Sequence, residues 1–188
     1  MNPDILRWDG KYSAAEARDF IEADELLEAN AALLSGKGRA LDVACGAGAN
    51  AIYAASRGYA TVGVDGSIEG LRLAARRARA LGLALQLINA DLECYCPPPG
   101  TFDLVLVFRY LNRPLFEALK QTLRPGGVIF FKTFNRNLLD TRPGFNPDYL
   151  LEPGELAGRF RGLEQIATND DADNRAAFSW WIGKRPMT

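Results

Sequence analysis

Short apolar runs alternate with helical patterns along the chain from Arg39 to the end. Five runs have the continuous apolar character of parallel strands covered on both faces, at residues 40–44, 61–64, 85–88, 104–108 and 128–131. Helical patterns lie between them, at residues 50–57, 67–81 and 114–123. Two last strands are expected at residues 163–167 and 176–182. The alternation predicts a doubly wound α/β domain that ends in an antiparallel hairpin.

Local signals predict where two further helices begin. Ser13 and Glu16 have the spacing of a capping box, which predicts helical sequence, as one helix or two, that opens at Ser13 and extends to residue 34. Pro153 is expected in the first turn of a short helix, since proline suits that position. We expect one domain with three parts: a helical segment (1–38), a ligand-binding core (39–133) and a final loop, helix and hairpin (134–188).

Composition narrows the classes of function. The 188 residues are 48% hydrophobic and 24% charged, which is typical of a globular domain. The net charge of −1 shows no excess of basic residues that would bind nucleic-acid phosphates. The apolar stretch at 104–108 is far shorter than the ~20 residues that a membrane-spanning helix needs. Three cysteines and no leader-like start predict a cytoplasmic protein with reduced thiols. The chain has no histidine, which excludes Ser-His, Cys-His and His-ligated zinc mechanisms, and we expect no metal.

A glycine-rich turn follows the first predicted strand. Gly46 and Gly48 have no Cβ, so the backbone there can approach a ligand closely. With Ala51 they also satisfy the dinucleotide-binding pattern Gly-x-Gly-x-x-Ala. The pattern alone is weak, because a tight strand-to-helix turn without any ligand has the same sequence.

Three carboxylates at the ends of successive strands favour one kind of ligand. Asp42 would repel a pyrophosphate at the glycine turn but can hold an ammonium group. Asp65 ends the second strand, where it can accept both hydroxyls of a ribose. Asp91 follows the third strand and can accept from an adenine amine. The sequence therefore predicts a cationic nucleoside as the ligand.

From Arg39 onward the chain resembles the class I S-adenosylmethionine-dependent methyltransferases. The glycine turn, Asp65, Asp91, residues 102–105 (Phe-Asp-Leu-Val) and residues 123–127 (Leu-Arg-Pro-Gly-Gly) all fall in register with that class. Within the class, the chain looks like the tellurite-resistance-type branch. The features that carry this closer resemblance are Trp8, Tyr12, residues 44–46, residues 50–51 and residues 146–156.

The resemblance implies a fold, a cofactor and a set of binding residues. The fold is a Rossmann-like, mostly parallel seven-stranded sheet with strand order 3-2-1-4-5-7-6 and an antiparallel last strand. The cofactor is S-adenosyl-L-methionine. The implied cofactor-binding residues are Trp8, Tyr12, Asp42, Ala44, Gly46, Gly48, Asn50, Asp65, Gly66, Ser67, Asp91, Leu92 and Phe108. Two positions depart from the pattern: Ala44 stands where the class has glycine, and Ala49 where the branch often has arginine.

The residues after the fourth strand are candidates for the reaction itself. Arg109 or Arg113 can bind an anionic acceptor, and Tyr110 can face the cofactor's sulfonium. Without histidine, and with an ordinary tyrosine pKa of about 10, no clear general base is placed there. We therefore expect a small-molecule acceptor that is nucleophilic in its ionised form, such as a thiol or a tellurium or selenium oxyanion.

Two other functions stay open from the sequence. A nicotinamide-dependent oxidoreductase uses the same glycine turn, although Asp42 and the terminal hairpin argue against it. A domain that binds S-adenosylmethionine without turning it over would have the same pattern. We expect no nucleic-acid or membrane partner, and a monomer or homodimer.

Overall fold

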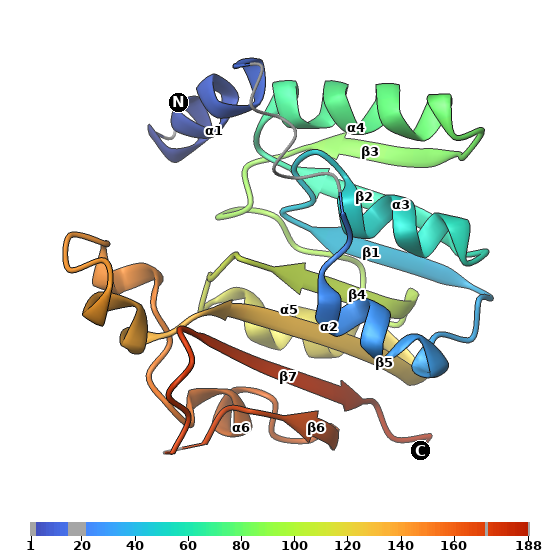
Figure 1. The fold of residues 1–188 in the computed structure, drawn as a ribbon. Helices are drawn as coiled ribbons and strands as arrows, with labels where there is room; N and C mark the ends of the chain where they lie inside the picture. Colours follow the sequence, from blue (N-terminus) through green and yellow to red (C-terminus); the bar gives the residue numbers. More distant parts are fainter. Residues whose placement is uncertain (1–2, 15–21, 172, 188) are drawn as a thin grey trace. The chain divides into compact units, whose positions relative to one another are not determined.

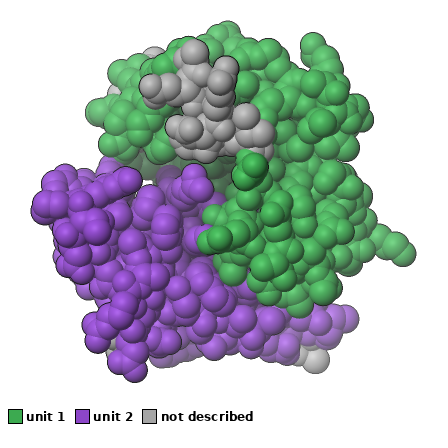
Figure 2. Space-filling model, in the orientation of Figure 1, with its two compact units in different colours: residues 1–96 green, residues 97–188 purple. Residues whose placement is uncertain are grey.

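The computed structural model describes residues 3–14, 22–171 and 173–187. Seven strands form one sheet with the order β3-β2-β1-β4-β5-β7-β6 (Figure 1). This order confirms the expected Rossmann-like α/β fold, and the antiparallel pairing of β7 with β5 and with β6 confirms the terminal hairpin. The chain divides into two compact units, residues 1–96 and 97–188, which are described in turn (Figure 2).

The first unit is built on three parallel strands, β1 (Arg39–Val43), β2 (Ala60–Asp65) and β3 (Leu85–Asn89). Its helices are α1 (Pro3–Ser13), α2 (Glu25–Ala29), the 3₁₀ turn η2 (Ala31–Leu33), α3 (Ala49–Ser56) and α4 (Ile68–Ala80). Helix α3 packs on β1 and β2, α4 on β2 and β3, and α1 on α4. The parallel strands place Asp42 and Asp65 near the carboxyl ends of neighbouring strands, which positions the candidate site.

Two sequence predictions in this unit were wrong. Helix α1 ends at Ser13, where a helix was expected to begin, and Glu16 lies outside the described residues. Helix α2 begins later, where the Asp24 carboxylate caps it by accepting the Leu26 N–H. Strand β3 is less buried than its apolar sequence suggested, with Ile88 42% exposed, because β3 is an edge strand that pairs with β2 alone.

The second unit contains β4 (Phe102–Phe108), β5 (Leu123–Phe134), β6 (Glu164–Thr168) and β7 (Phe178–Lys184). Its helices are α5 (Leu115–Thr122) and α6 (Glu155–Arg159), with 3₁₀ turns η3 (Arg136–Asp140) and η4 (Pro147–Tyr149). Strand β5 begins five residues earlier than expected (Leu123 against Val128), because Leu123 already pairs with Phe102 before the register shifts. Four aromatic rings, Phe116, Phe131, Phe160 and Trp181, pack together at centroid distances of 4.6–5.5 Å to form its core.

Helix α6 begins later than predicted. Pro153 lies outside the helix, and Gly154 is the N-cap with a left-handed backbone (φ 80°). The buried Asp170 carboxylate, from the loop between β6 and β7, accepts the N–H groups of Gly154 and Leu156 at 3.1 and 2.7 Å. A carboxylate distant in sequence thus supplies the cap that local residues lack.

Within the described part of the chain, no helix combines the length and the apolar character needed to cross a membrane. All three cysteines are free thiols.

Candidate functional site

The turn that joins β1 to α3 has an unusual backbone. Gly46 (φ 49°) and Gly48 (φ 79°) are left-handed, a conformation that favours glycine, and the Gly48 N–H donates to the Cys45 carbonyl at 2.8 Å. Ala44 is left-handed as well (φ 59°), although it has a Cβ. A left-handed residue with a side chain costs about 1–2 kcal/mol, and such strain concentrates at functional sites.

The Asp42 carboxyl group lies directly beneath this turn and is only 2% exposed. Burial raises the pKa of Asp42 to about 8, against the lowering effect of a hydrogen bond from the Ala51 N–H, and the negative charge of Asp65 raises it further. Its Oδ2 has no hydrogen-bond partner among the described residues. A buried acceptor without a donor is costly, and a cationic ligand would satisfy it.

The Asp65 carboxylate ties the end of β2 to the glycine turn. Its Oδ2 accepts the Gly46 N–H and its Oδ1 accepts the Ser67 N–H, both at 2.7 Å. Burial raises the pKa of Asp65, and these two backbone hydrogen bonds oppose the rise. Each oxygen of a carboxylate has a second lone pair, so both can still accept a hydroxyl.

The two glycines of the turn also have packing roles. A Cβ on Gly46 would collide with the Tyr12 hydroxyl, and a Cβ on Gly48 would lie 2.7 Å from the Cβ of Ala74 on α4. Gly48 therefore allows the turn to rest on α4, while the space above Gly46 contains the Tyr12 side chain.

Helix α1 lies over this part of the first unit. The rings of Trp8 and Tyr12 stack at 5.7 Å. The Asp9 carboxylate accepts the Ser67 hydroxyl at 2.5 Å and the Glu69 N–H at 3.2 Å, which fixes α1 to the first turn of α4. No local pattern pointed to Asp9, because its partners lie about 60 residues away in the sequence.

The remaining predicted residues of the first unit have separate local roles. The Asn50 side-chain oxygen accepts the Asp24 N–H at 2.8 Å and so holds the start of α2. Asp91 is exposed, and its Oδ1 accepts the Glu93 N–H at 3.0 Å. Leu92 is buried, and Gly66 leaves room for the Ile5 side chain.

The predicted reaction residues belong to the second unit. Phe108 is buried at the end of β4. Arg109 follows it with an exposed side chain and a left-handed backbone (φ 57°), and its N–H donates to the Lys132 carbonyl at 2.7 Å. Tyr110 is half-buried. A strained, exposed arginine at a strand end is a candidate for contact with an anion.

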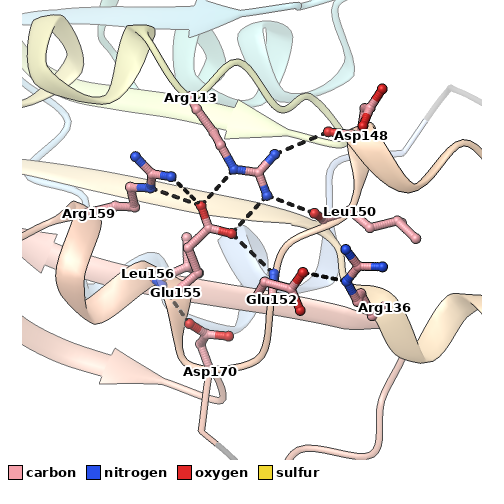
Figure 3. Close-up of polar contacts among 9 residues, drawn as sticks. All are labelled: Arg113, Arg136, Asp148, Leu150, Glu152, Glu155, Leu156, Arg159 and Asp170. Carbon is pink, nitrogen blue, oxygen red and sulfur yellow. Dashed lines mark hydrogen bonds and ion pairs between the residues drawn. The ribbon is translucent and has the colours of Figure 1, made fainter.

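Arg113, four residues further on, is fully engaged with the protein itself (Figure 3). Its guanidinium makes two hydrogen bonds of 2.8 Å to the two Glu155 carboxylate oxygens and also donates to the carbonyls of Asp148 and Leu150. Glu155 also binds Arg159 and the Glu152 N–H. Arg113 therefore fixes the chain before α6 and has little capacity left for a ligand.

The residues of the first unit fit a cationic nucleoside cofactor. Asp42 offers a buried acceptor without a donor, Asp65 has free lone pairs at the end of β2, and Asp91 is exposed after β3. Among the described residues, no group of three or more cysteine, aspartate or glutamate side chains has the arrangement of a metal site.

Comparison with known proteins finds methyltransferases among the matches. A family model described as a methyltransferase domain matches residues 40–127. A ubiquinone biosynthesis O-methyltransferase of Aliivibrio fischeri (strain MJ11) is 32% identical over 139 residues, which are 70% of this chain and 58% of that protein. The corresponding protein of Pectobacterium carotovorum is 33% identical over 105 residues, 53% of this chain and 44% of that protein. The chain thus spans about half the length of the curated relatives it matches.

Solved structures share the fold at low sequence identity. TehB from Haemophilus influenzae superposes with a TM-score of 0.71 at 14% identity, over 95% of this chain and 65% of that chain. An S-adenosylmethionine-dependent methyltransferase from Mesorhizobium loti superposes with a TM-score of 0.66 at 20% identity, over 84% of this chain and 96% of that chain.

Proposed function

Because this chain belongs to the class I S-adenosylmethionine-dependent methyltransferases, we propose that it transfers a methyl group to a small-molecule acceptor that reacts in its ionised form. The buried, donor-less Oδ2 of Asp42 beneath the glycine turn is the observation that carries the cofactor half of this proposal. An anionic group at this turn would be repelled by the carboxylate, whereas an ammonium group would both donate a hydrogen bond to that oxygen and neutralise its charge.

We propose specific roles for the residues of the first unit. S-adenosylmethionine, when bound, supplies a methyl group made electrophilic by its sulfonium. Asp42 and the turn at Gly46 and Gly48 hold the methionine portion, Asp65 accepts the ribose hydroxyls, and Asp91 with Leu92 holds the adenine. Trp8, Tyr12, Ala44, Asn50, Gly66 and Ser67 complete this part of the site. These residues bind and orient the cofactor and exclude water.

The acceptor half of the proposal depends on which groups the chain lacks. There is no histidine, and the Tyr110 hydroxyl is a poor base at neutral pH. The Arg109 guanidinium is exposed and has no hydrogen bond or ion pair among the described residues. We propose that Arg109 attracts an acceptor that already carries negative charge, such as a thiolate or a tellurium or selenium oxyanion.

An oxygen acceptor is the second candidate. The relatives in Aliivibrio and Pectobacterium are named O-methyltransferases, and their identity to this chain exceeds 30%. A hydroxyl that ionises only at high pH needs a base, so this candidate differs from the first in its expected pH dependence.

The dependence of rate on pH tests the acceptor proposal. Methylation of thiophenol and of 2-mercaptoethanol should rise with pH at two different midpoints, each set by the ionisation of the acceptor. Arg109→Gln should raise the KM for both thiols about tenfold, since it removes one charged hydrogen bond. Tellurite, selenite and a catechol are compared under the same conditions.

Three results would contradict this mechanism. Both profiles breaking at the same pH, together with loss of turnover in Tyr110→Phe while cofactor binding survives, would identify an enzymic base. Turnover of the catechol but of no thiol or oxyanion would favour the oxygen acceptor. Cofactor binding without turnover of any acceptor would point to a non-catalytic binding domain.

A further inference from the structure

Helix α4 contacts the glycine turn through one charged side chain. Arg77 lies in its last turn, and its Nη1 donates to the Ala47 carbonyl at 2.7 Å, across 30 residues of sequence. The side chain is half-buried, and burial lowers the pKa of Arg77. A cation that gives up part of its hydration needs compensating contacts, and the Ala47 carbonyl supplies one of them.

The contact acts on a peptide group that is held at both ends. The Ala47 carbonyl and the Gly48 N–H belong to the same planar trans peptide, so they point in opposite directions. Arg77 binds the carbonyl, and the Cys45 carbonyl accepts the Gly48 N–H at 2.8 Å. Together the two hydrogen bonds fix the orientation of this peptide plane.

The rest of the turn is anchored by other groups. The Cys45 N–H donates to the Val64 carbonyl at 3.1 Å, and the Gly46 N–H donates to Asp65 at 2.7 Å. Neither of these two hydrogen bonds touches the Ala47–Gly48 peptide, which the Arg77 side chain reaches. Gly48 also rests on Ala74, one turn before Arg77 on the same helix.

Neighbouring arginines on α4 do not share this arrangement. Arg76 and Arg79 are exposed, and Arg72 forms an ion pair with Glu69 at 2.5 Å. Substitutions on this one helix can therefore compare Arg77, which contacts the glycine turn, with Arg76 and Arg79, which have the same charge and are exposed to solvent.

We propose that Arg77 is a positioning residue for the cofactor: it holds the Ala47–Gly48 peptide in the orientation that the methionine portion requires. This inference rests on the proposed function, since it takes the glycine turn as the cofactor-binding turn. Arg77 acts through the backbone, so its removal should weaken cofactor binding more than it weakens the fold.

Calorimetric titration with S-adenosylhomocysteine tests the proposal on the whole protein. Arg77→Gln should raise the Kd at least tenfold, and Arg77→Lys, which keeps the charge and part of the reach, should raise it less. Arg76→Gln is the matched control, with the same change of charge on the same helix, and should change the Kd less than twofold. Urea unfolding of each variant shows whether the fold is retained.

Amide spectra of the ligand-free protein give a second readout. The ¹H–¹⁵N signals of Gly46 and Gly48 should shift in Arg77→Gln and stay in place in Arg76→Gln. A folded Arg77→Gln with wild-type Kd, or an equal rise in Kd for both glutamine variants, would overturn the proposal. If Arg77→Gln does not fold, Arg77→Lys is compared with Arg76→Gln instead, and a wild-type Kd in folded Arg77→Lys would overturn the proposal. Failure of the wild-type protein to bind the cofactor would instead overturn the proposed function, while the amide shifts would still report on Arg77.

Discussion

Asp42→Asn is expected to stabilise the fold at neutral and alkaline pH and to weaken cofactor binding. Burial raises the pKa of Asp42 from 3.8 to about 8, so between these values the folded protein holds a proton that the unfolded chain releases. Stability from this group is therefore lost as the pH rises through that window, at about 1.4 kcal/mol per pH unit. Asparagine does not ionise and removes this dependence.

The measurement is the free energy of unfolding by urea at pH 5 and pH 8 for both proteins. The stability of Asp42→Asn relative to wild type should increase by about 4 kcal/mol between the two pH values. Asp91→Asn, at an exposed carboxylate, serves as the control and should show a change below about 0.5 kcal/mol.

Cofactor affinity should change in the opposite direction. Asp42→Asn should raise the Kd for S-adenosylmethionine at least tenfold, because the Asp42 carboxyl group can lose its proton when a cation binds, whereas asparagine cannot ionise. Equal pH dependence of stability in both proteins would show that Asp42 is ionised in the folded state and would contradict the argument.

Arg113→Met is expected to cost about 2–4 kcal/mol of stability. Methionine keeps the apolar part of the arginine side chain but cannot donate hydrogen bonds. The Glu155 carboxylate, on a side chain that is only 12% exposed, therefore loses both hydrogen bonds from the Arg113 guanidinium. It also removes the donors to the carbonyls of Asp148 and Leu150. Thermal or urea unfolding at pH 7 measures the loss.

The neighbouring arginine on the same carboxylate is the matched comparison. Arg159→Met also removes an ion pair with Glu155, but Arg159 is four residues along the same helix and more exposed, so the cost should stay below about 1 kcal/mol. Burial raises the pKa of Glu155, but the hydrogen bonds from Arg113, the Glu152 N–H and Arg159 outweigh this effect and lower that pKa to about 2. The contribution of Glu155 should therefore be lost as the pH falls from about 4.5 towards 2. Similar costs for both variants would contradict a special role for Arg113.

Much of the fold could be read from the sequence because its signals are local. Each expected strand from 40–44 to 176–182 corresponds to a strand of the sheet, with shifts of at most five residues at the ends. A continuous apolar run depends only on neighbouring residues, so the sequence itself reveals it. The strand order followed from the resemblance to a family rather than from any spacing.

What the sequence could not reveal depends on residues that are distant along the chain. Asp170 caps α6 from the loop between β6 and β7, and Asp9 binds the first turn of α4 from α1. A side chain that satisfies a distant backbone group leaves no periodic pattern. The capping-box spacing of Ser13 and Glu16 misled for the converse reason, since a local signal was present where α1 ends.

The candidate site shows the same division. The acids Asp42 and Asp65 were predicted from their places at strand ends, and the structure brings both against the glycine turn. The sequence did not show that the Asp42 carboxyl group is buried with one oxygen lacking a hydrogen-bond donor. Nor did it show that the Arg113 guanidinium is bound by the Glu155 carboxylate. Burial and partner choice follow from packing of the whole chain.

Calorimetric titration of the wild-type protein with S-adenosylmethionine and with NAD tests the central claim most directly, with Asp65→Asn as a site-specific comparison. We expect S-adenosylmethionine to bind with a Kd in the micromolar range, a binding free energy of about −8 kcal/mol, and NAD to give no measurable heat. The folded Asp65→Asn variant should bind S-adenosylmethionine more weakly than the wild-type protein does. Tight binding of NAD with no signal from S-adenosylmethionine would contradict the account and favour a nicotinamide-dependent oxidoreductase.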